Sequence, residues 1–373
     1  MVSDVEDNED TNENENINEN EASLTKNFDN ELQINDNSAL TFKLHKKTIF
    51  CCNLSSNDKY VVSGDEDDMA YVWKVEDGSI HFQCEGHTDS VIDAKFNINS
   101  NYLATIDMKG TIKIWLVENG QCVTQTQLED LNWIDWHPVL ENVLLLGGAE
   151  GNCYVVKVNS KKELDLKILS SASNALHGFF LKDGKKCITG HENGSVKLWD
   201  IQDSKKIYRF KTDGEYSITC LAINFENTLI SIGYEHSQLV VINATNGKKI
   251  YESIKEKEDN TIEAMAFSKM LSLLVVCYLD GDIEVLDLKT FLIRDKINFK
   301  QGFTKVIFDR INDYKFYVAS LDGSIKCLDI RNLELIFEHT GHKSHVLDFQ
   351  ISQKNNFIVS CSEDFTCKVF EKN

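Results

Sequence analysis

The sequence lacks the segments that would insert it into a membrane or export it. No apolar run approaches the roughly 20 residues that a membrane-spanning helix needs. The first residues are acidic and polar, without the basic start and apolar core of a secretory signal peptide. We therefore expect a cytoplasmic protein with no membrane partner, and the nucleus is the alternative compartment.

Paired cysteines are absent as well. The chain has 11 cysteines, but none forms the Cys-x-x-Cys pair that zinc sites usually need. Most of them fall within apolar, strand-like stretches. We interpret them as reduced, buried, small apolar residues, and we predict no metal site.

The motifs of common catalytic centres are also missing. GxSxG, the lysine-containing phosphate loop, GxGxxG and HExxH do not occur. The glycine-rich stretch 147–151 lacks the Lys-Ser/Thr end of a phosphate loop, and the 10 histidines are dispersed. Because an enzyme needs a nucleophile, base or metal set that converges, we predict a non-enzymatic binding protein without a cofactor.

Charge is distributed unevenly along the chain. The net charge is −20 over 373 residues, and residues 1–40 contain twelve acids against one lysine. This Asn/Glu-rich stretch has too few apolar groups to offset the entropy cost of ordering. We predict that residues 1–38 form a disordered acidic tail. Its role could be to keep the chain soluble or to attract basic partners, and the sequence leaves both open.

What the sequence does contain is a repeat. Successive copies are separated by 41 to 44 residues when they are aligned on one large apolar position, which is occupied by Trp73, Trp115, Val156, Trp199, Ile242, Leu286, Leu328 and Phe370. Each copy adds alternating strand-like runs and a turn, often acid–Gly or Asn–Gly. Four short strands in about 40–45 residues are typical of a propeller blade. The sequence thus predicts an all-β fold, an eight-bladed β-propeller over residues 39–373.

One stretch, Leu128–Pro138, contains two tryptophans, a histidine and three acids, and could be taken for a catalytic pocket. The repeat places Trp133 and Trp136 on the innermost strand of the third copy. We therefore interpret both as core packing between blades, and His137 as structural. Pro138 follows the end of the strand, where no backbone donor is needed.

The repeat resembles the WD40 family. Gly86-His87 and Gly341-His342 match the Gly-His element of that family, and residues 198–200 match its Trp-Asp end, which includes Trp199. Gly190-His191 is not counted, because it falls in a hairpin between strands. In WD40 blades the outermost strand comes from the next repeat, so the resemblance implies that residues 39–44 pair with the last copy.

The resemblance also implies buried sets of His, Ser/Thr, a turn Asp and Trp, hydrogen-bonded within a blade. The first copy has a full set, the second has Lys109 at the position of the acid, and the last has Phe370 in place of Trp. The matching residues are His45, Ser63, Asp67 and Trp73 in the first copy, His87, Thr105 and Trp115 in the second, and His342, Ser360 and Asp364 in the last.

Acids gather in two kinds of connection that should meet at one end of the propeller, the loops before the innermost strands and the turns between the next two strands. The candidate partner-binding acids are Glu66, Asp68, Glu85, Asp89, Glu129, Asp130, Glu150, Glu192, Glu235, Glu258, Asp259 and Glu363. Lysine pairs at 161–162, 185–186, 205–206 and 248–249 fall on the opposite connections. This asymmetry favours a cationic partner and disfavours nucleic acid. The alternative is that any acidic protein displays acids on its loops.

The second and third copies, including "GHTDSVIDAKFNINSNYLATIDMKGTIKIW" at 86–115, are similar to the angio-associated migratory cell protein group. That group includes a yeast ribosome-assembly chaperone, whose acidic loop face holds the basic N-terminal segment of a newly made large-subunit ribosomal protein of the L-ten class. The resemblance covers about residues 40–373 and implies a monomeric chaperone acting in assembly of the 60S ribosomal subunit.

Two other functions stay open. One is a substrate adaptor of a cullin-type ubiquitin ligase, since residues 328–331 ("LDIR") resemble the Asp-x-x-Arg strand end used for that docking, although the Trp is lost. The other is a signalling or cytoskeletal scaffold, as suggested for animal members of the group.

Overall fold

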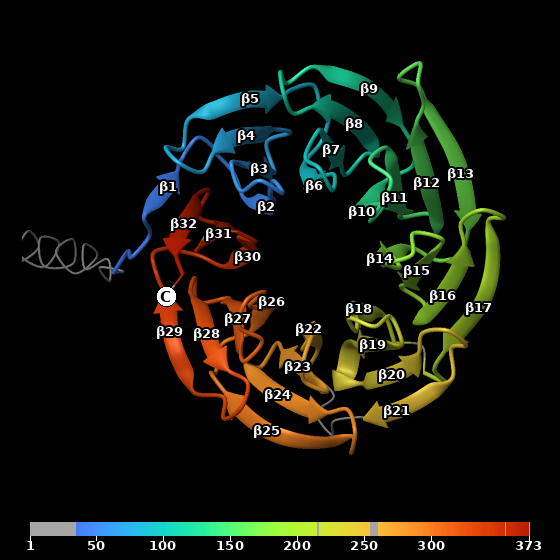
Figure 1. Cartoon of the computed structure of the whole chain (residues 1–373), viewed down its shortest axis with the longest axis vertical. Helices are drawn as coiled ribbons and strands as arrows, with labels where there is room; N and C mark the ends of the chain where they lie inside the picture. Colours follow the sequence, from blue (N-terminus) through green and yellow to red (C-terminus); the bar gives the residue numbers. More distant parts are fainter. Residues whose placement is uncertain (1–34, 215, 254–259, 355, 373) are drawn as a thin grey trace, which may run out of the picture. The chain divides into compact units, whose positions relative to one another are not determined.

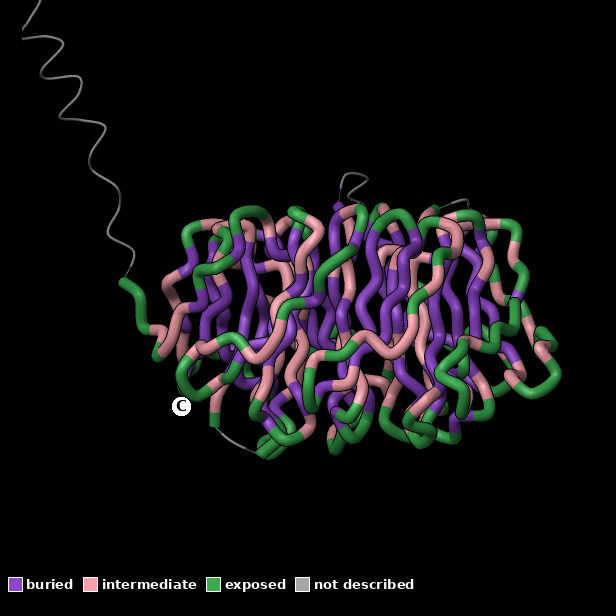
Figure 2. The backbone as a smooth tube through the Cα atoms, turned by 90° about the horizontal axis from the view of Figure 1, so that it is seen from above, coloured by how far each residue is buried: buried purple, intermediate pink, exposed green. Residues whose placement is uncertain are grey.

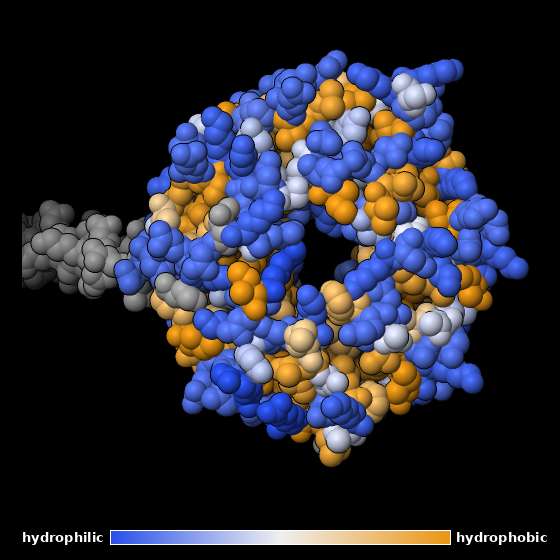
Figure 3. Space-filling view, in the orientation of Figure 1, coloured by the Kyte–Doolittle hydropathy of each residue, from blue (hydrophilic) through white to orange (hydrophobic). Residues whose placement is uncertain are grey.

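A computed structural model describes residues 35–214, 216–253, 260–354 and 356–372. Its strands form eight four-stranded antiparallel sheets, which follow one another around a ring as the blades of a propeller (Figure 1). The space-filling view leaves a central opening (Figure 3). The predicted all-β, eight-bladed propeller is therefore confirmed.

Each blade takes consecutive strands, with the innermost strand first. Blade 1 contains β2 (Ile49–Leu54), β3 (Tyr60–Asp65), β4 (Ala70–Lys74) and β5 (Ile80–Cys84), and blade 2 contains β6 (Val91–Phe96), β7 (Tyr102–Asp107), β8 (Thr111–Leu116) and β9 (Cys122–Gln127). Blade 3 contains β10 (Leu131–Trp136), β11 (Val143–Gly148), β12 (Asn152–Val158) and β13 (Leu164–Ser170), and blade 4 contains β14 (Ala175–Phe180), β15 (Lys186–His191), β16 (Ser195–Asp200) and β17 (Lys205–Lys211).

The second half of the ring repeats this order. Blade 5 contains β18 (Ile218–Ile223), β19 (Leu229–Tyr234), β20 (Leu239–Asn243) and β21 (Lys249–Ser253), with a short 3-10 turn η1 (Glu235–Ser237) after β19, and blade 6 contains β22 (Ile262–Phe267), β23 (Leu273–Tyr278), β24 (Asp282–Asp287) and β25 (Leu292–Asn298). Blade 7 contains β26 (Phe303–Phe308), β27 (Lys315–Ser320), β28 (Ile325–Asp329) and β29 (Leu335–His339), and blade 8 contains β30 (Val346–Ile351), β31 (Phe357–Ser362) and β32 (Cys367–Glu371).

The ring is closed by β1 (Leu40–Phe42), which is the outermost strand of blade 8. It pairs antiparallel with β32, with Leu40 opposite Val369 and Phe42 opposite Cys367. The pairing implied for residues 39–44 is thus present for Leu40–Phe42, and it covers an edge that would otherwise stay open.

The residues just before β1 are already attached to the propeller. Asp36 accepts a hydrogen bond from Lys368 Nζ at 2.5 Å, and the backbone N–H of Asn37 donates to Thr340 O at 3.0 Å. Asp36–Ser38, which the sequence predicts to lie in the tail, therefore belong to the folded part. Residues 1–34 lie outside the described residues, and the disorder predicted for them stays a prediction.

The two tryptophans of β10 bind the neighbouring blades together, as the sequence predicts. Trp133 Nε1 donates to Ala175 O in blade 4 at 2.9 Å, and Trp136 Nε1 donates to Lys95 O in blade 2 at 2.7 Å. Both side chains are buried. A Cβ atom at Gly178 would lie 2.2 Å from the Trp133 ring, so this glycine makes room for the indole.

The hydrogen-bonded set of blade 1 corrects one prediction. His45 contacts Ser63 Oγ through Nε2 at 2.7 Å and Asp65 Oδ2 through Nδ1 at 2.5 Å, and Trp73 Nε1 donates to Ser63 Oγ at 3.2 Å. The acid of the set is Asp65, so the prediction of Asp67 was wrong. Asp65 is the last residue of β3 and faces the histidine, whereas Asp67 is exposed in the following turn and only its backbone N–H contacts Asp65.

The same two-residue error affects blade 2. His87 contacts Thr105 Oγ1 at 2.7 Å and Asp107 Oδ2 at 3.2 Å, and Trp115 Nε1 donates to Thr105 at 2.9 Å. The set is therefore complete, and Lys109 does not take the place of its acid. Burial acts to raise the pKa of Asp107, but hydrogen bonds from His87 and from Thr88 and Thr111 outweigh it and lower the pKa to about 2.

In blade 8 the acid lies where the sequence predicts it. His342 contacts Ser360 Oγ at 2.8 Å and Asp364 Oδ2 at 3.0 Å, while Phe370 packs edge-on against the imidazole. Here the acid stands two residues beyond the end of β31, and Thr366 Oγ1 also donates to it at 2.6 Å.

Blade 4 contains an equivalent set that the sequence pattern does not predict. Trp199 Nε1 donates to Thr189 Oγ1 at 2.9 Å, and His191 contacts the same oxygen at 2.9 Å and Ser173 O at 2.9 Å. His191 lies at the end of β15, in the hairpin where the sequence placed it, but it performs the bridging role of a blade histidine. The sequence pattern did not reveal this role, because His191 lies two residues after Thr189, whereas the histidines of the other sets lie 18 residues before their Ser or Thr.

Candidate binding face

The antiparallel order of the strands places two kinds of connection at one end of every blade. These are the loop that leads into the innermost strand and the turn between the second and third strands. We call this end of the propeller the acidic end, and the other the opposite end. Figure 2 shows that exposed turns cap both ends of the buried strands.

All ten described acids of the candidate set lie at the acidic end. Five are exposed, and their carboxylates form no ion pair with any described cation: Glu66, Glu85, Asp130, Glu150 and Glu192. We call these five the free acids. Asp68, Asp89, Glu129, Glu235 and Glu363 are half-buried. Glu258 and Asp259 lie outside the described residues, so their placement stays a prediction.

Three of the half-buried acids are each bonded to the neighbouring connection of the same blade. Asp89 pairs with Lys109 at 3.0 Å. Glu363 accepts from Ser344 Oγ at 3.0 Å, and Glu235 accepts from a backbone N–H at 3.4 Å. These acids contribute to the negative field of the end, but part of their hydrogen-bonding capacity is already used.

The pKa of Asp68 is raised by burial and by crowding of like charges. Burial raises its pKa, and the neighbouring carboxylates of Asp89, Asp67 and Asp107 raise it further, against the opposing effect of Lys109. Such repulsion between acids shows that this part of the end has more negative charge than its own cations neutralise.

Glu129 departs from its predicted place on the exposed rim. Its side chain folds down over blade 3, so that a Cβ atom at Gly148 would lie 2.0 Å from Glu129 Oε1. Both carboxylate oxygens are shielded from solvent. Burial raises the pKa of Glu129 and Glu150 adds to the rise, whereas hydrogen-bonding contacts with the Tyr154 side chain and the Asn152 backbone lower it. Glu129 is therefore a buried, poorly compensated carboxylate just beneath the free acids.

The cations are distributed differently. Those in the described connections of the acidic end are Lys43, Lys46, Lys47, Lys109, Lys300 and Lys343, whereas the acids there comprise the ten candidates together with Asp67, Asp213, Asp280, Asp322 and Asp364. The four predicted lysine pairs all lie at the opposite end, in or beside its turns. The described connections of the acidic end are thus net negative, whereas those of the opposite end contain the lysine pairs together with acids such as Glu118, Glu141 and Glu163.

Within the described residues, no group of three His, Cys, Asp or Glu side chains is placed to hold a metal ion, and no helix is long and apolar enough to cross a bilayer. Ten of the 11 cysteines are buried, and burial raises the pKa of Cys153, for example, to about 12. A thiol with so high a pKa is a poor nucleophile at neutral pH.

Comparison with known proteins places the chain among repeat propellers. The model "WD domain, G-beta repeat" matches residues 37–74, 78–115, 167–200 and 333–371, and the model of the anaphase-promoting complex subunit 4 WD40 domain matches residues 221–311. The human angio-associated migratory cell protein is 34% identical over 352 residues, which cover 90% of this chain and 80% of that protein. The ribosome assembly protein SQT1 of Saccharomyces cerevisiae is 22% identical over 91% of this chain and 88% of its own length.

Two solved structures share the fold. The Saccharomyces cerevisiae Sqt1 structure superposes with a TM-score of 0.84 at 20% identity, over 91% of this chain and 100% of the other. The Chaetomium thermophilum Sqt1 structure, which is bound to the N-terminus of the ribosomal protein L10, gives 0.81 at 20% identity, over 90% and 100% of the two chains. At this identity the likeness shows the fold alone.

Proposed function

Because the chain belongs to the angio-associated migratory cell protein family of WD40-repeat propellers, we propose that it is a non-enzymatic chaperone of a newly made basic ribosomal protein. It would hold the basic N-terminal segment of an L10-class protein on its acidic end during assembly of the 60S subunit. The chain would act as a monomer in the cytoplasm, before the client meets ribosomal RNA. The complex of Chaetomium Sqt1 with the N-terminus of L10 supports this choice of client.

The observation that carries the proposal is the set of free acids. An isolated exposed ion pair contributes little, because water screens it. Several carboxylates fixed around one rim act together, however, and a cationic segment that touches all of them gains affinity and a fast association rate. The turns are held by rigid sheets, so little ordering is needed on the side of this chain when the client binds.

Glu129 adds a second, local reason to expect a cation. A carboxylate whose pKa is raised by burial and by a second carboxylate raises the free energy of the unbound protein when it is ionised. A lysine or arginine entering beside Glu129 and Glu150 would supply a charged donor. Binding of a cation at this point would thus offset part of the free energy that burying the ionised Glu129 carboxylate costs the unbound protein.

Sequestration explains why such a face would be useful. A ribosomal protein with clustered lysine and arginine side chains binds phosphate backbones without sequence preference. Carboxylates in fixed positions can occupy the same cations until ribosomal RNA replaces them. The free chaperone repels nucleic acid with the same face, so it does not compete for the client's final binding site.

Titration calorimetry with a synthetic N-terminal peptide of an L10-class protein tests the proposal. The double variant Glu150→Lys/Glu192→Lys should weaken binding about a hundredfold, since it replaces two attractions by repulsions. The matched control is Glu118→Lys, an exposed acid in the β8–β9 turn of the opposite end, which should bind like the unchanged chain.

Salt provides an independent readout. Because screening lengths fall from about 30 Å at 0.01 M to about 8 Å at 0.15 M ionic strength, affinity should fall steeply over that range. Equal affinity at low and high salt, or an equal loss in Glu118→Lys, would rule out the acidic end as the binding surface.

The ubiquitin-ligase adaptor has weaker support. The hypothesis that the chain docks to a ubiquitin ligase rests on Arg331. The guanidinium of Arg331 is already held by Asp329, through Nε at 2.9 Å and Nη2 at 2.5 Å. Co-purification from translating extract would separate the candidates, because it would recover a ribosomal protein, a ligase subunit or signalling and cytoskeletal proteins.

A further inference from the structure

The outermost strand of blade 4 differs in charge from every other outermost strand of the propeller. β17, with the sequence "KKIYRFK", has a formal charge of +4 and contains no acid. The other seven, β1, β5, β9, β13, β21, β25 and β29, each have a formal charge between −1 and +1. On a chain whose net charge is −20, β17 is therefore a local concentration of positive charge on the outside of the ring (Figure 1).

The pairing of β16 with β17 places like charges against each other, because Lys197 lies directly opposite Arg209. Opposite residues of two strands, and residues two apart on one strand, point to the same face of a sheet. Trp199 shares this face and packs in one core cluster with Trp133 of blade 3, so the face is turned toward blade 3. Four cations share it, and we call them the blade 4 cations: Lys197, Lys206, Arg209 and Lys211.

The charge of the blade 4 cations is not neutralised within the chain. The side chains of Lys206, Arg209 and Lys211 are exposed and form no hydrogen bond or ion pair with a described residue. Lys197 is buried beneath them and donates to Ser171 Oγ. Burial, and then the charges of Arg209 and Lys206, lower the pKa of Lys197 to about 8, and no carboxylate among the described residues counters them. Because like charges directly opposite each other destabilise a sheet, the fold retains a repulsion that its own acids do not relieve.

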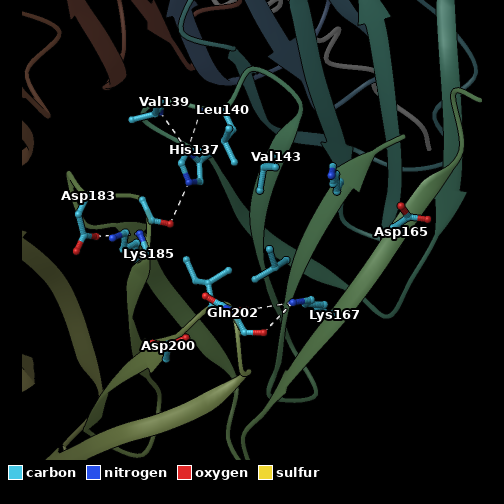
Figure 4. Close-up of a pocket in the computed structure, with 14 residues that line it drawn as sticks. His137, Val139, Leu140, Val143, Asp165, Lys167, Asp183, Lys185, Asp200 and Gln202 are labelled. Carbon is cyan, nitrogen blue, oxygen red and sulfur yellow. Dashed lines mark hydrogen bonds between the residues drawn. The ribbon is translucent and has the colours of Figure 1, made fainter. Parts of the chain in front are cut away.

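The groove beside Leu140, at the opposite end between blades 3 and 4, has a balanced charge instead (Figure 4). Its lining contains three lysines and three aspartates, and so favours neither sign of charge: Lys157, Lys167, Lys185, Asp165, Asp183 and Asp200. Lys205, the first residue of β17, lies opposite Asp200 and belongs to this balanced region. The excess of positive charge is thus confined to the blade 4 cations.

The backbone of β17 is open on the side away from β16. Blade 4 is ordered β14-β15-β16-β17, so no described strand pairs with the outer edge of β17. Five of its seven side chains are exposed, whereas Tyr208 and Phe210 pack inward against the core cluster of blades 4 and 5. An open edge offers a row of backbone N–H and C=O groups to an added strand. Because its cations repel a second copy of β17, this edge accepts a strand of opposite charge more readily than a strand of its own kind.

We infer that β17 is a docking edge for an acidic, extended polypeptide segment, which adds to blade 4 as a fifth strand. Acids at every second residue of that segment would point to the face of the blade 4 cations, because side chains alternate along a strand. The cations select the sign of the charge, and the row of backbone groups selects a polypeptide. Nucleic acid fits less well, since Tyr208 and Phe210 are packed inward and leave no aromatic platform on β17 for stacking bases.

A labelled peptide, acetyl-Glu-Thr-Glu-Val-Glu-Thr-Glu-amide, provides the probe, with binding to the full chain followed by fluorescence anisotropy. Arg209→Glu should weaken binding tenfold or more, since it replaces the central attraction by a repulsion. The matched control is Arg294→Glu, an exposed arginine on β25, which is the seven-residue outermost strand of blade 6. It should bind the peptide like the unchanged chain. Thermal unfolding shows whether both variants remain folded.

A rearranged peptide separates the addition of a strand from a general attraction of anions. Acetyl-Glu-Glu-Glu-Glu-Thr-Val-Thr-amide has the same composition, but its acids do not alternate, so it should bind several-fold more weakly. Hydrogen exchange provides a direct measurement of the docking edge. Backbone amides of β17 should become protected when the alternating peptide binds, whereas those of β25 should exchange as before.

Equal losses in Arg209→Glu and Arg294→Glu, equal affinity for the two peptides, or unchanged exchange in β17 would overturn the inference. A uridine-rich RNA oligonucleotide that binds β17 more tightly than the peptide would overturn it as well. So would self-association of Arg209→Glu without loss of peptide binding, which would show that the cations only keep copies of the chain apart. The basic L10-class peptide should bind Arg209→Glu as it binds the unchanged chain, so failure of this inference is distinguishable from failure of the proposed function.

Discussion

The two ends of the propeller are built from the same short connections between antiparallel strands, but their side chains differ. At the acidic end the turns carry the free acids, and the exposed apolar side chains, such as Met108 and Phe365, stand among carboxylates. At the opposite end the turns nearest the channel expose Ile98, Val139, Leu140, Phe225, Met270, Ile311 and Tyr314. The contrast shows that the fold determines the backbone of a turn but leaves its side chains free to specialise.

The acidic end contains a second contrast within itself. Asp65, Asp107 and Asp364 lie at or just beyond strand ends and bind blade histidines. The free acids stand a few residues away and form no ion pair with any described cation. Some carboxylates of this end therefore stabilise the fold, whereas others are available to a partner, and substitutions should separate the two groups.

The largest expected effect on stability belongs to Asp107. Asp107→Asn should lower the free energy of unfolding by about 2 kcal/mol at pH 7, the value that corresponds to a pKa depressed from 3.8 to about 2. Because the folded-state pKa is the lower one, this contribution is complete above about pH 4 and is lost as the pH falls toward 2. Urea unfolding at pH 7 and pH 3 measures it.

The control for this variant is Lys109→Ala, two residues away in the turn. It should leave the free energy of unfolding nearly unchanged, since Lys109 is exposed and pairs only with Asp89 at the surface. A larger loss in Lys109→Ala than in Asp107→Asn would mean that the acid of blade 2 has been misassigned.

Ionisation of Glu129 should destabilise the folded chain, in contrast to ionisation of Asp107. Its pKa is raised in the folded state, so ionisation costs stability, and the protein is relatively more stable below the unfolded pKa than above the folded one. Glu129→Gln should therefore stabilise the unbound chain by up to about 1 kcal/mol at pH 7, with the gain vanishing in acid. The same variant should bind the basic peptide more weakly.

Thermal unfolding across pH, with Glu150→Gln as the exposed control, provides the measurement. A loss of stability in Glu129→Gln at neutral pH would show instead that the carboxylate is well compensated in the folded chain. Glu129 would then count among the acids that hold the fold.

The smallest effect is expected at the opposite end. Met270→Ser and Ile311→Ser should change the free energy of unfolding by less than about 0.5 kcal/mol, because these side chains are 77% and 76% exposed and bury little area. Their removal should reduce binding of a hydrophobic dye and improve solubility. A marked loss of stability would show that the two side chains are covered in solution, and would weaken the contrast between the ends.

The sequence by itself determined the fold and the gross charge pattern. The spacing of Trp73, Trp115 and Trp199 and their counterparts predicts eight blades, because each repeat must supply one sheet of four short strands. Successive connections lie at alternate ends of the propeller, so the sequence also predicts the end at which each candidate acid and each lysine pair lies, without knowledge of any contact. Closure through β1 follows from the family resemblance and is likewise present.

Only the tertiary structure decided which of these residues contact one another. Whether Asp65 or Asp67 faces His45 depends on where the strand ends and the turn begins, and a shift of two residues leaves the sequence pattern unchanged. The role of His191, the burial of Glu129 over Gly148 and the groove beside Leu140 each depend on segments that are distant in sequence. Periodicity reports the repeating backbone, whereas the meeting of individual side chains depends on how neighbouring blades pack.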